Sequence, residues 1–252
     1  MVPGLEQFGK HFADFSDSYV LIGGAAADLA MDEAGLPFRA TKDLDIVLHL
    51  EVLQASFSGV FWDFVRAGQY EIQERADGRQ QYYRFKKPKV PGYPAMLELF
   101  TRKPDQLNIP EGSHLTPIPM DSAAKSLSAI LLNEAYYEFI HSGRRLVRGL
   151  SVIGADRLIP LKAHAWIDLT AKKAGGQDVD SKDISKHRND VFRLTQLLVP
   201  TDTIQVSKTI RMDMQRFIEK AAIDSIDLKA IRAGFTSVHD ILATLSTVYQ
   251  LA

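Results

Sequence analysis

Two aspartates, Asp43 and Asp45, stand one residue apart at the start of an apolar run that continues to Leu50. Side chains alternate between the two faces of a strand, so an extended chain here projects both carboxylates to one side and Leu44 to the other. Two carboxylates that lie side by side on one face repel each other unless a cation lies between them. Mg²⁺ prefers oxygen ligands and typically takes one or two carboxylates plus substrate phosphates. The spacing therefore indicates a site for Mg²⁺ or Mn²⁺.

A glycine pair, Gly23-Gly24, follows an apolar run at 19–22 and precedes a helix-forming segment. Because glycine has no Cβ, the backbone can approach a ligand closely there. The first turn of a helix also presents free N–H groups and a positive dipole end to an anion. A phosphate-binding turn followed by an acid pair is the pattern of a nucleotide site. Taken singly, the glycines fit a tight turn and the acids a solvated start of a strand.

Glu98 is a third candidate because it is the one charged residue in the apolar run at 95–101. A buried carboxylate is costly unless it is paired or bound to a metal, so this residue is a candidate metal ligand. The alternative is a glutamate on the exposed face of the strand. Before the acid pair, Arg39, Thr41 and Lys42 supply cations and a hydroxyl that we expect to contact phosphate.

The elements that position these residues alternate between strand and helix. A strand at 19–22 runs into the glycine pair, and a helix at 25–34 ends at Gly35 and Pro37, which are typical stop signals. After the strand that follows the acid pair, the pattern predicts a helix at 51–67, a β-hairpin at 69–87 that turns at Asp77-Gly78, and a strand at 95–101.

The second arm of this hairpin, at 80–87, interleaves basic residues with Tyr82, Tyr83 and Phe85. Such interleaving can bind single-stranded nucleic acid through base stacking and phosphate contacts. The alternative is a solvated basic face over an apolar underside. The pattern alone leaves both interpretations open.

Beyond about residue 120 the chain is expected to be mostly helical. Apolar residues at helical spacing predict helices at 120–141, 160–173, 181–198, 203–222 and 226–248. We therefore expect an α+β domain at 1–120, with a mixed sheet flanked by helices. A mainly helical domain at 121–252 would follow it and close a cleft.

Composition narrows the class of protein. The chain has 252 residues, 46% of them hydrophobic, which is enough for a sizeable core. It has no cysteine, so disulfides and thiolate metal sites are excluded, and its net charge of −1 gives no global basic field for nucleic acid. The N-terminus lacks a signal-peptide pattern, and no apolar run approaches the ~20 residues of a membrane helix. We therefore expect a cytoplasmic protein with no membrane partner.

The order of these features resembles the nucleotidyltransferase fold of polymerase-beta-like enzymes. That fold has Gly-Gly or Gly-Ser after the first strand, Asp-x-Asp at the start of the next, and a third acid on a later strand. The resemblance covers about residues 19 to 100, and it implies that Asp43, Asp45 and Glu98 are catalytic metal ligands. The longer gap before the acids looks most similar to the AbiEii-like branch of nucleotidyltransferase toxins.

The helical half looks similar to the same branch. The pattern around Lys162 and the pattern around Asp190 resemble a helix lysine that meets the triphosphate and a later aspartate that completes the site. The resemblance therefore implies nucleotide contacts for these two residues. The alternative is an ordinary surface lysine.

The resemblance implies transfer of a nucleoside monophosphate from an NTP to an acceptor hydroxyl, on an RNA or tRNA end or on a protein. It also implies a toxin role, with a cognate antitoxin protein as partner. The alternatives are an inactive nucleotide-binding or sensing protein, a small-molecule transferase of the antibiotic-modifying type, and an interaction domain with a fortuitous acid pair. The motifs G-x-x-x-x-G-K-[ST] and G-x-S-x-G are absent from the sequence.

Overall fold

The computed structural model describes residues 2–54, 56–74, 80–105, 115–118, 128–224 and 226–251. The chain forms two compact units, Met1–Leu29 with Arg39–Ile153, and Ala30–Phe38 with Gly154–Ala252. We call them the sheet unit and the helical unit. This division falls later in the chain than the domain boundary proposed near residue 120.

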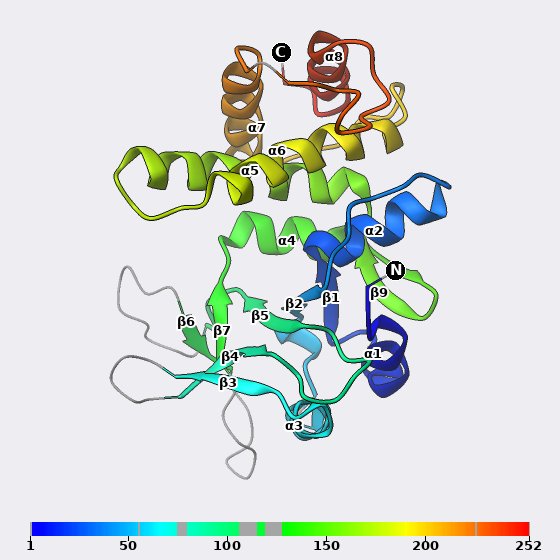
Figure 1. Ribbon diagram of the computed structural model, residues 1–252, viewed down its shortest axis with the longest axis vertical. Coiled ribbons are helices and arrows are strands. Elements are labelled where there is room, and N and C mark those ends of the chain that lie inside the picture. Colours follow the sequence, from blue (N-terminus) through cyan, green and yellow to red (C-terminus); the bar gives the residue numbers. More distant parts are fainter. Residues whose placement is uncertain are drawn as a thin grey trace. The chain divides into compact units, whose positions relative to one another are not determined.

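The sheet unit is built on nine described strands in the main order β3-β4-β5-β2-β1-β9-β8, with β7 pairing to both β5 and β6 (Figure 1). The sheet is mixed, since β1 and β2 are antiparallel whereas β2 and β5 are parallel. The strands are β1 (Tyr19–Ile22), β2 (Asp43–Leu48), β3 (Glu71–Glu74), β4 (Gln80–Lys86), β5 (Met96–Thr101), β6 (Leu115–Pro117), β7 (Ser128–Leu131), β8 (Arg144–Val147) and β9 (Leu150–Ile153).

The central strands β1 and β2 differ in burial, and burial changes along β2 at its two aspartates. All four residues of β1 are buried. In β2, Asp43 and Asp45 are half-buried around the fully buried Leu44, and Ile46 and the two residues after it are buried on both faces. The strand therefore has a polar start open to solvent on one face and an apolar remainder inside the sheet.

The described helices of the sheet unit are α1 (Leu5–His11), α2 (Gly23–Glu33) up to Leu29, α3 (Ser56–Gly68) and α4 (Glu134–Ser142). Aromatic rings fill the core beside α1 and α3. Phe12 contacts Phe8, Phe57 and Phe64 at centroid distances of 4.5–5.6 Å. This packing holds α3 against α1. The position of α3 confirms most of the helix predicted at 51–67.

The predicted hairpin is present as the antiparallel pair β3–β4, whereas its predicted turn at Asp77-Gly78 lies outside the described residues. Tyr83 and Phe85 are buried, with 8% and 0% exposure, and Arg84 lies between them on the opposite face. The two aromatics thus form the apolar underside of the strand. They are not available as a stacking surface for nucleic acid.

The predicted helix at 120–141 is wrong over the residues that form β7. Residues 119–127 lie outside the described part of the chain, and Ile130 pairs with Phe100 of β5. The helix α4 begins only at Glu134, where the Asn133 side chain accepts a hydrogen bond from Ala135 N at 2.9 Å. Short apolar runs suit a strand or a buried helix, and pairing with β5 decides between them.

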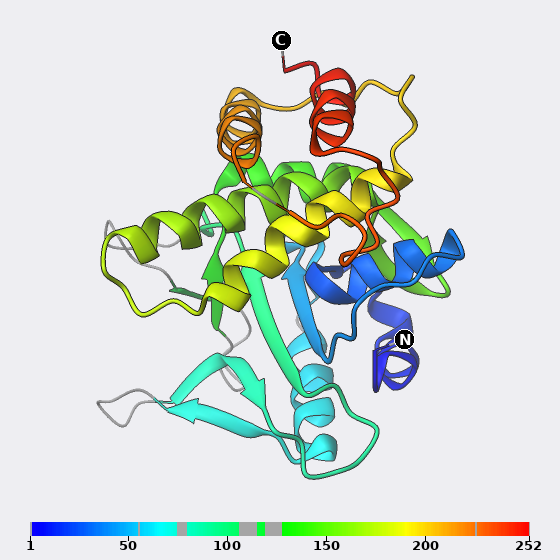
Figure 2. The ribbon, with the colours of Figure 1, turned by 45° about the horizontal axis from the view of Figure 1, so that its top comes forward.

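The helical unit contains α5 (Ala155–Ala174), α6 (Ser181–Leu194), α7 (Lys208–Ala221) and α8 (Val238–Val248). Figure 2 shows α5 and α6 side by side, and Phe217 of α7 packs on Trp166 of α5 and Phe192 of α6 at 5.2 and 6.2 Å. The helix predicted to open at Pro160 starts five residues earlier. The predicted fold class, an α+β mixed sheet with helices followed by a helical part, is confirmed. Among the described helices, none is long and apolar enough to cross a membrane.

Candidate active site

The predicted acids meet on neighbouring parallel strands. The register of β2 and β5 sets Asp45 opposite Glu98, and neighbouring strands lie about 4.8 Å apart. Leu44, Leu97 and Leu99 are fully buried on the other face. Because side chains alternate, Asp45 and Glu98 lie side by side on the opposite face of the sheet, which we call the site face. Asp43 lies on the same face, two residues before Asp45 along β2.

The glycine turn, Gly23-Gly24, lies directly against Asp45. Gly23 has a φ of +66°, which favours glycine, and a Cβ on it would overlap the Asp45 carboxylate. A Cβ on Gly24 would overlap the Thr41 hydroxyl. The helix α2 begins at Gly23 itself, so its first turn adjoins both polar groups. The glycines are required here because Asp45 and Thr41 approach the backbone closely.

Arg84 belongs to this site, although it was not among the predicted site residues. The antiparallel register of β4 and β5 sets Arg84 opposite Glu98, and the two side chains form an ion pair. Arg84, Glu98 and Asp45 therefore form a row across three neighbouring strands. The alternation of Arg84 with two aromatics was the available sequence signal, but it did not reveal which residue Arg84 would face.

The pairing with Arg84 shows how Glu98 is accommodated in a largely buried position. The Glu98 side chain is 11% exposed and its charge is balanced by the guanidinium. Within the described residues, no three carboxylate or imidazole side chains are grouped in a way that could hold a metal ion. The oxygen donors of Asp43, Asp45 and Glu98 are of the type Mg²⁺ prefers, but Glu98 is turned to Arg84.

The loop before β2 contributes the remaining predicted residues of the sheet unit. Lys42 is exposed, and its carbonyl accepts a hydrogen bond from Ala95 N at 2.8 Å, which ties the start of β2 to the segment before β5. Arg39 and Thr41 are half-buried. Thr41 thus lies at the glycine turn. For Lys42 the contact is made by the backbone, and a phosphate contact of its side chain stays a prediction.

In the helical unit, the structure brings Lys162 and Asp190 together as a buried ion pair. Lys162 Nζ donates to Asp190 Oδ2 at 2.8 Å, and the two residues are 4% and 0% exposed. Arg193 Nη1 donates to the other carboxylate oxygen at 3.2 Å. The alternative of a surface lysine is therefore wrong. The pair joins α5 to α6, and a nucleotide role for it stays a prediction.

A second polar cluster, also missed from the sequence, lies beyond the other end of β2. The rings of His49 and His141 stack at 4.1 Å, and Glu51 accepts hydrogen bonds from Tyr137 and Arg102 at 2.6 and 2.7 Å. Burial lowers the pKa of His141 to about 4, and the nearby His49 is the second cause of this lowering. The cluster therefore holds an uncharged imidazole near neutral pH.

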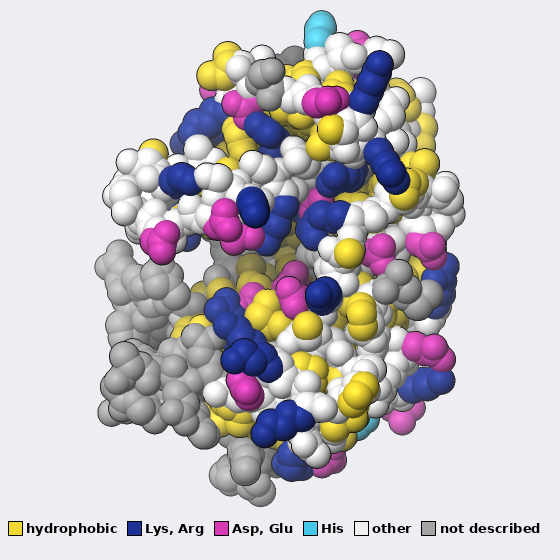
Figure 3. Space-filling view, viewed as in Figure 1, with side chains coloured by type: hydrophobic (Ala, Val, Ile, Leu, Met, Phe, Trp, Pro, Cys, Tyr) yellow, Lys and Arg dark blue, Asp and Glu magenta, His cyan; other side chains and the backbone are white. Residues whose placement is uncertain are grey.

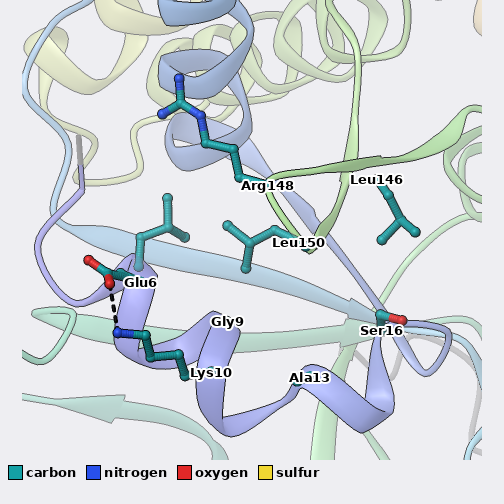
Figure 4. A pocket seen from close by; sticks show the side chains of 10 residues that line it. Glu6, Gly9, Lys10, Ala13, Ser16, Leu146, Arg148 and Leu150 are labelled. Atoms are coloured by element: carbon teal, nitrogen blue, oxygen red, sulfur yellow. Dashed lines mark hydrogen bonds and ion pairs between the residues drawn. The ribbon is translucent and has the colours of Figure 1, made fainter.

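A hollow of about 440 Å³ lies between α1 and the β8–β9 hairpin (Figure 4). Leu146 and Leu150 line it, and an ion pair between Lys10 and Glu6 at 2.7 Å stands at one side. None of the predicted site residues lines this hollow. Its lining mixes leucines with Arg148 and the paired Lys10 and Glu6, and it contains none of the predicted acids.

Comparison with solved structures finds distant similarities along nearly the whole chain. The chain is similar to an antigenic nucleotidyltransferase-like protein from Paracoccidioides brasiliensis, with 16% identity over 98% of this chain and 97% of that one, and a TM-score of 0.49. It is also similar to the antibiotic-resistance factor ANT(2'')-Ia, with 14% identity over 92% and 96% of the two chains and a TM-score of 0.38. No protein-family model and no curated protein matches the chain.

Proposed function

We propose that the protein is a metal-dependent nucleotidyltransferase, which moves a nucleoside monophosphate from an NTP to an acceptor hydroxyl and releases pyrophosphate. The observation that carries the proposal is the position of Asp45. Its carboxylate lies against the Gly23 turn and, through the strand register, beside Glu98. Asp45 thereby joins the proposed phosphate-binding turn to the three acids Asp43, Asp45 and Glu98, which we call the acid row.

The donor set fits a hard divalent cation. Asp43 and Asp45 share one half-buried face and would hold Mg²⁺ or Mn²⁺ there, with Glu98 as a third ligand once it leaves Arg84. When bound, the metal would neutralise phosphate charge and stabilise the entering and leaving oxygens of an in-line displacement. The positions of the three carboxylates would set where the metal's positive charge lies.

The chain's own residues have separable tasks in this proposal. The first turn of α2 and the Thr41 hydroxyl bind the terminal phosphates, since free N–H groups and a helix N-terminus favour anions. The acceptor oxygen forms a bond to the α-phosphorus, and the bond from that phosphorus to the bridging oxygen breaks. The proton of the acceptor passes to Glu98, and the electron pair of the broken bond leaves with pyrophosphate.

Residues outside the acid row are proposed to assist nucleotide binding without taking part in the transfer step. Arg39 and Lys42 add positive charge near the triphosphate. For Lys162 and Asp190, the resemblance to the toxin branch implies a role in nucleotide binding, which we include in the proposal. Their buried ion pair makes this a positioning role, because neither side chain is exposed.

The acceptor is the open part of the proposal, and an RNA end, a protein hydroxyl and a small molecule all remain candidates. On the face shown in Figure 3, acidic and basic side chains are intermingled, in keeping with the net charge of −1. A broad RNA-binding surface would need a basic field. A toxin role with an antitoxin partner is proposed from the resemblance in the sequence.

A second candidate function, nucleotide sensing without transfer, has one observation in its favour. The ion pair of Arg84 with Glu98 occupies the third acid. If that pair never opens, the site could bind a nucleotide at the glycine turn but would lack a full metal-ligand set. The same fold would then report nucleotide and not consume it.

The experiment follows the α-phosphate. Each NTP, labelled at the α-phosphorus, is incubated with Mn²⁺ or Mg²⁺ and with bulk tRNA, a protein extract or the protein alone, and pyrophosphate is measured in parallel. We expect label in one acceptor pool with matching pyrophosphate, lost in Asp45→Asn. Nucleotide binding without label transfer to any pool would favour the sensor.

A further inference from the structure

Arg84 is the side chain that holds the third acid of the row. It pairs with Glu98 across β4 and β5, directly beside the position of Asp45 on β2. The buried Tyr83 and Phe85 on either side of it fix the strand, so the guanidinium faces the acid row and not the core. The arrangement places a fixed positive charge where a metal ion would be needed.

The environment makes this ion pair stronger than a surface one. The side chains of Arg84 and Glu98 are 29% and 11% exposed, so water screens their attraction only in part. Lys87, the residue directly after β4, provides a contrast. It pairs with Glu71 at 3.2 Å, with side chains that are 77% and 52% exposed.

We propose that Arg84 is a stand-in cation, which neutralises Glu98 while no metal is bound and releases it when metal and nucleotide arrive together. This inference rests on the proposed function, because it concerns how that site is loaded. A divalent cation shared by Asp45 and Glu98 would lie beside the guanidinium, and the two positive charges would repel. Metal alone therefore binds weakly.

A nucleotide changes that balance. Its triphosphate is a polyanion, and an arginine fork pairs well with phosphate oxygens. Once released from Glu98, Arg84 gains a new partner in the triphosphate, and Glu98 becomes free to bind the metal. Binding of metal and of nucleotide are thus coupled through one side chain, and the coupling is reciprocal. The site loads with the metal–nucleotide complex in preference to either component alone.

The test is a Mn²⁺ titration followed by the spin-resonance signal of free Mn²⁺, with and without a non-hydrolysable NTP analogue. In Arg84→Gln, we expect Mn²⁺ alone to bind about 10-fold more tightly than in the wild type, within the usual range of coupling between sites. In Lys87→Gln, which makes the same change in net charge, we expect a change of less than about twofold. In Arg84→Lys, which keeps the charge, affinity should stay close to the wild-type value.

The outcomes separate this inference from the proposed function. If the wild type binds Mn²⁺ with the analogue, Asp45→Asn abolishes that binding, and Arg84→Gln shows no gain for Mn²⁺ alone, the stand-in role is overturned and the nucleotide site stands. If no variant binds Mn²⁺ under either condition, both are overturned. Should Arg84→Gln be too unstable to titrate, its unfolding temperature should rise more with Mn²⁺ alone than that of the wild type, and an equal rise overturns the inference.

Discussion

Gly23 offers the sharpest test of how the glycine turn and the acid row fit together. Its φ of +66° alone costs an alanine about 1–2 kcal/mol. In addition, the new Cβ would overlap the Asp45 carboxylate and crowd that side chain's Cβ at 3.2 Å. Moving Asp45 adds about 1–2 kcal/mol. We therefore expect Gly23→Ala to lower the free energy of unfolding by about 2–4 kcal/mol.

Gly35 provides a matched control, because its φ is +69° and a Cβ on it would meet nothing within 4 Å. Gly35→Ala should cost only the backbone part, about 1–2 kcal/mol. At about 2–4 °C per kcal/mol for a chain of this size, the two variants should be separable by thermal unfolding. In Gly23→Ala/Asp45→Ala, much of the excess cost should disappear, since the crowded carboxylate is gone. Equal losses for Gly23→Ala and Gly35→Ala would refute the close approach of Asp45 to the turn.

Two further predictions concern stability. The lowered pKa of His141, about 4 when folded against 6.5 in its ordinary state, means that the unfolded chain binds more protons between these values, so stability is full above pH 6.5 and falls as the pH drops towards 4. Urea unfolding at about pH 7 and about pH 4.5 should show a loss of about 1–2 kcal/mol, after allowance for partial exposure, that is reduced in His141→Phe; an unchanged loss would contradict it. Lys162→Met should cost about 3 kcal/mol by leaving the Asp190 carboxylate buried without its closest cation, and Lys162→Met/Asp190→Leu should recover most of that; a double variant as unstable as the single one would contradict this reasoning.

The parts of the site that depend on short-range rules could be predicted from the sequence. Strand alternation puts Asp43 and Asp45 on one face with Leu44 in the core, and the cost of burying a lone carboxylate singled out Glu98. A helix following Gly24 was also predictable. In each case a few neighbouring residues and the local geometry of the chain carry the information.

The parts that depend on pairing between distant segments could not be predicted. Arg84 faces Glu98 only because β4 pairs with β5 in one register, and a shift by one residue would turn it to the other face. The segment at 128–131 is a strand because β5 is available as its partner, although its apolar spacing also suits a helix. The contact of Lys162 with Asp190, 28 residues away along the chain, likewise depends on how α5 packs on α6.

The measurement that tests the central claim most directly is thermal unfolding with each of the four NTPs, with and without Mg²⁺, for the wild type and for Asp43→Asn/Asp45→Asn. A ligand that binds only the folded state stabilises it by about 2.7 kcal/mol at a hundredfold excess over its dissociation constant. We predict a metal-dependent rise in the unfolding temperature with at least one NTP that the double variant loses. The absence of a rise with any NTP in the wild type, or an equal rise in the double variant, would contradict a nucleotide site at the acid row.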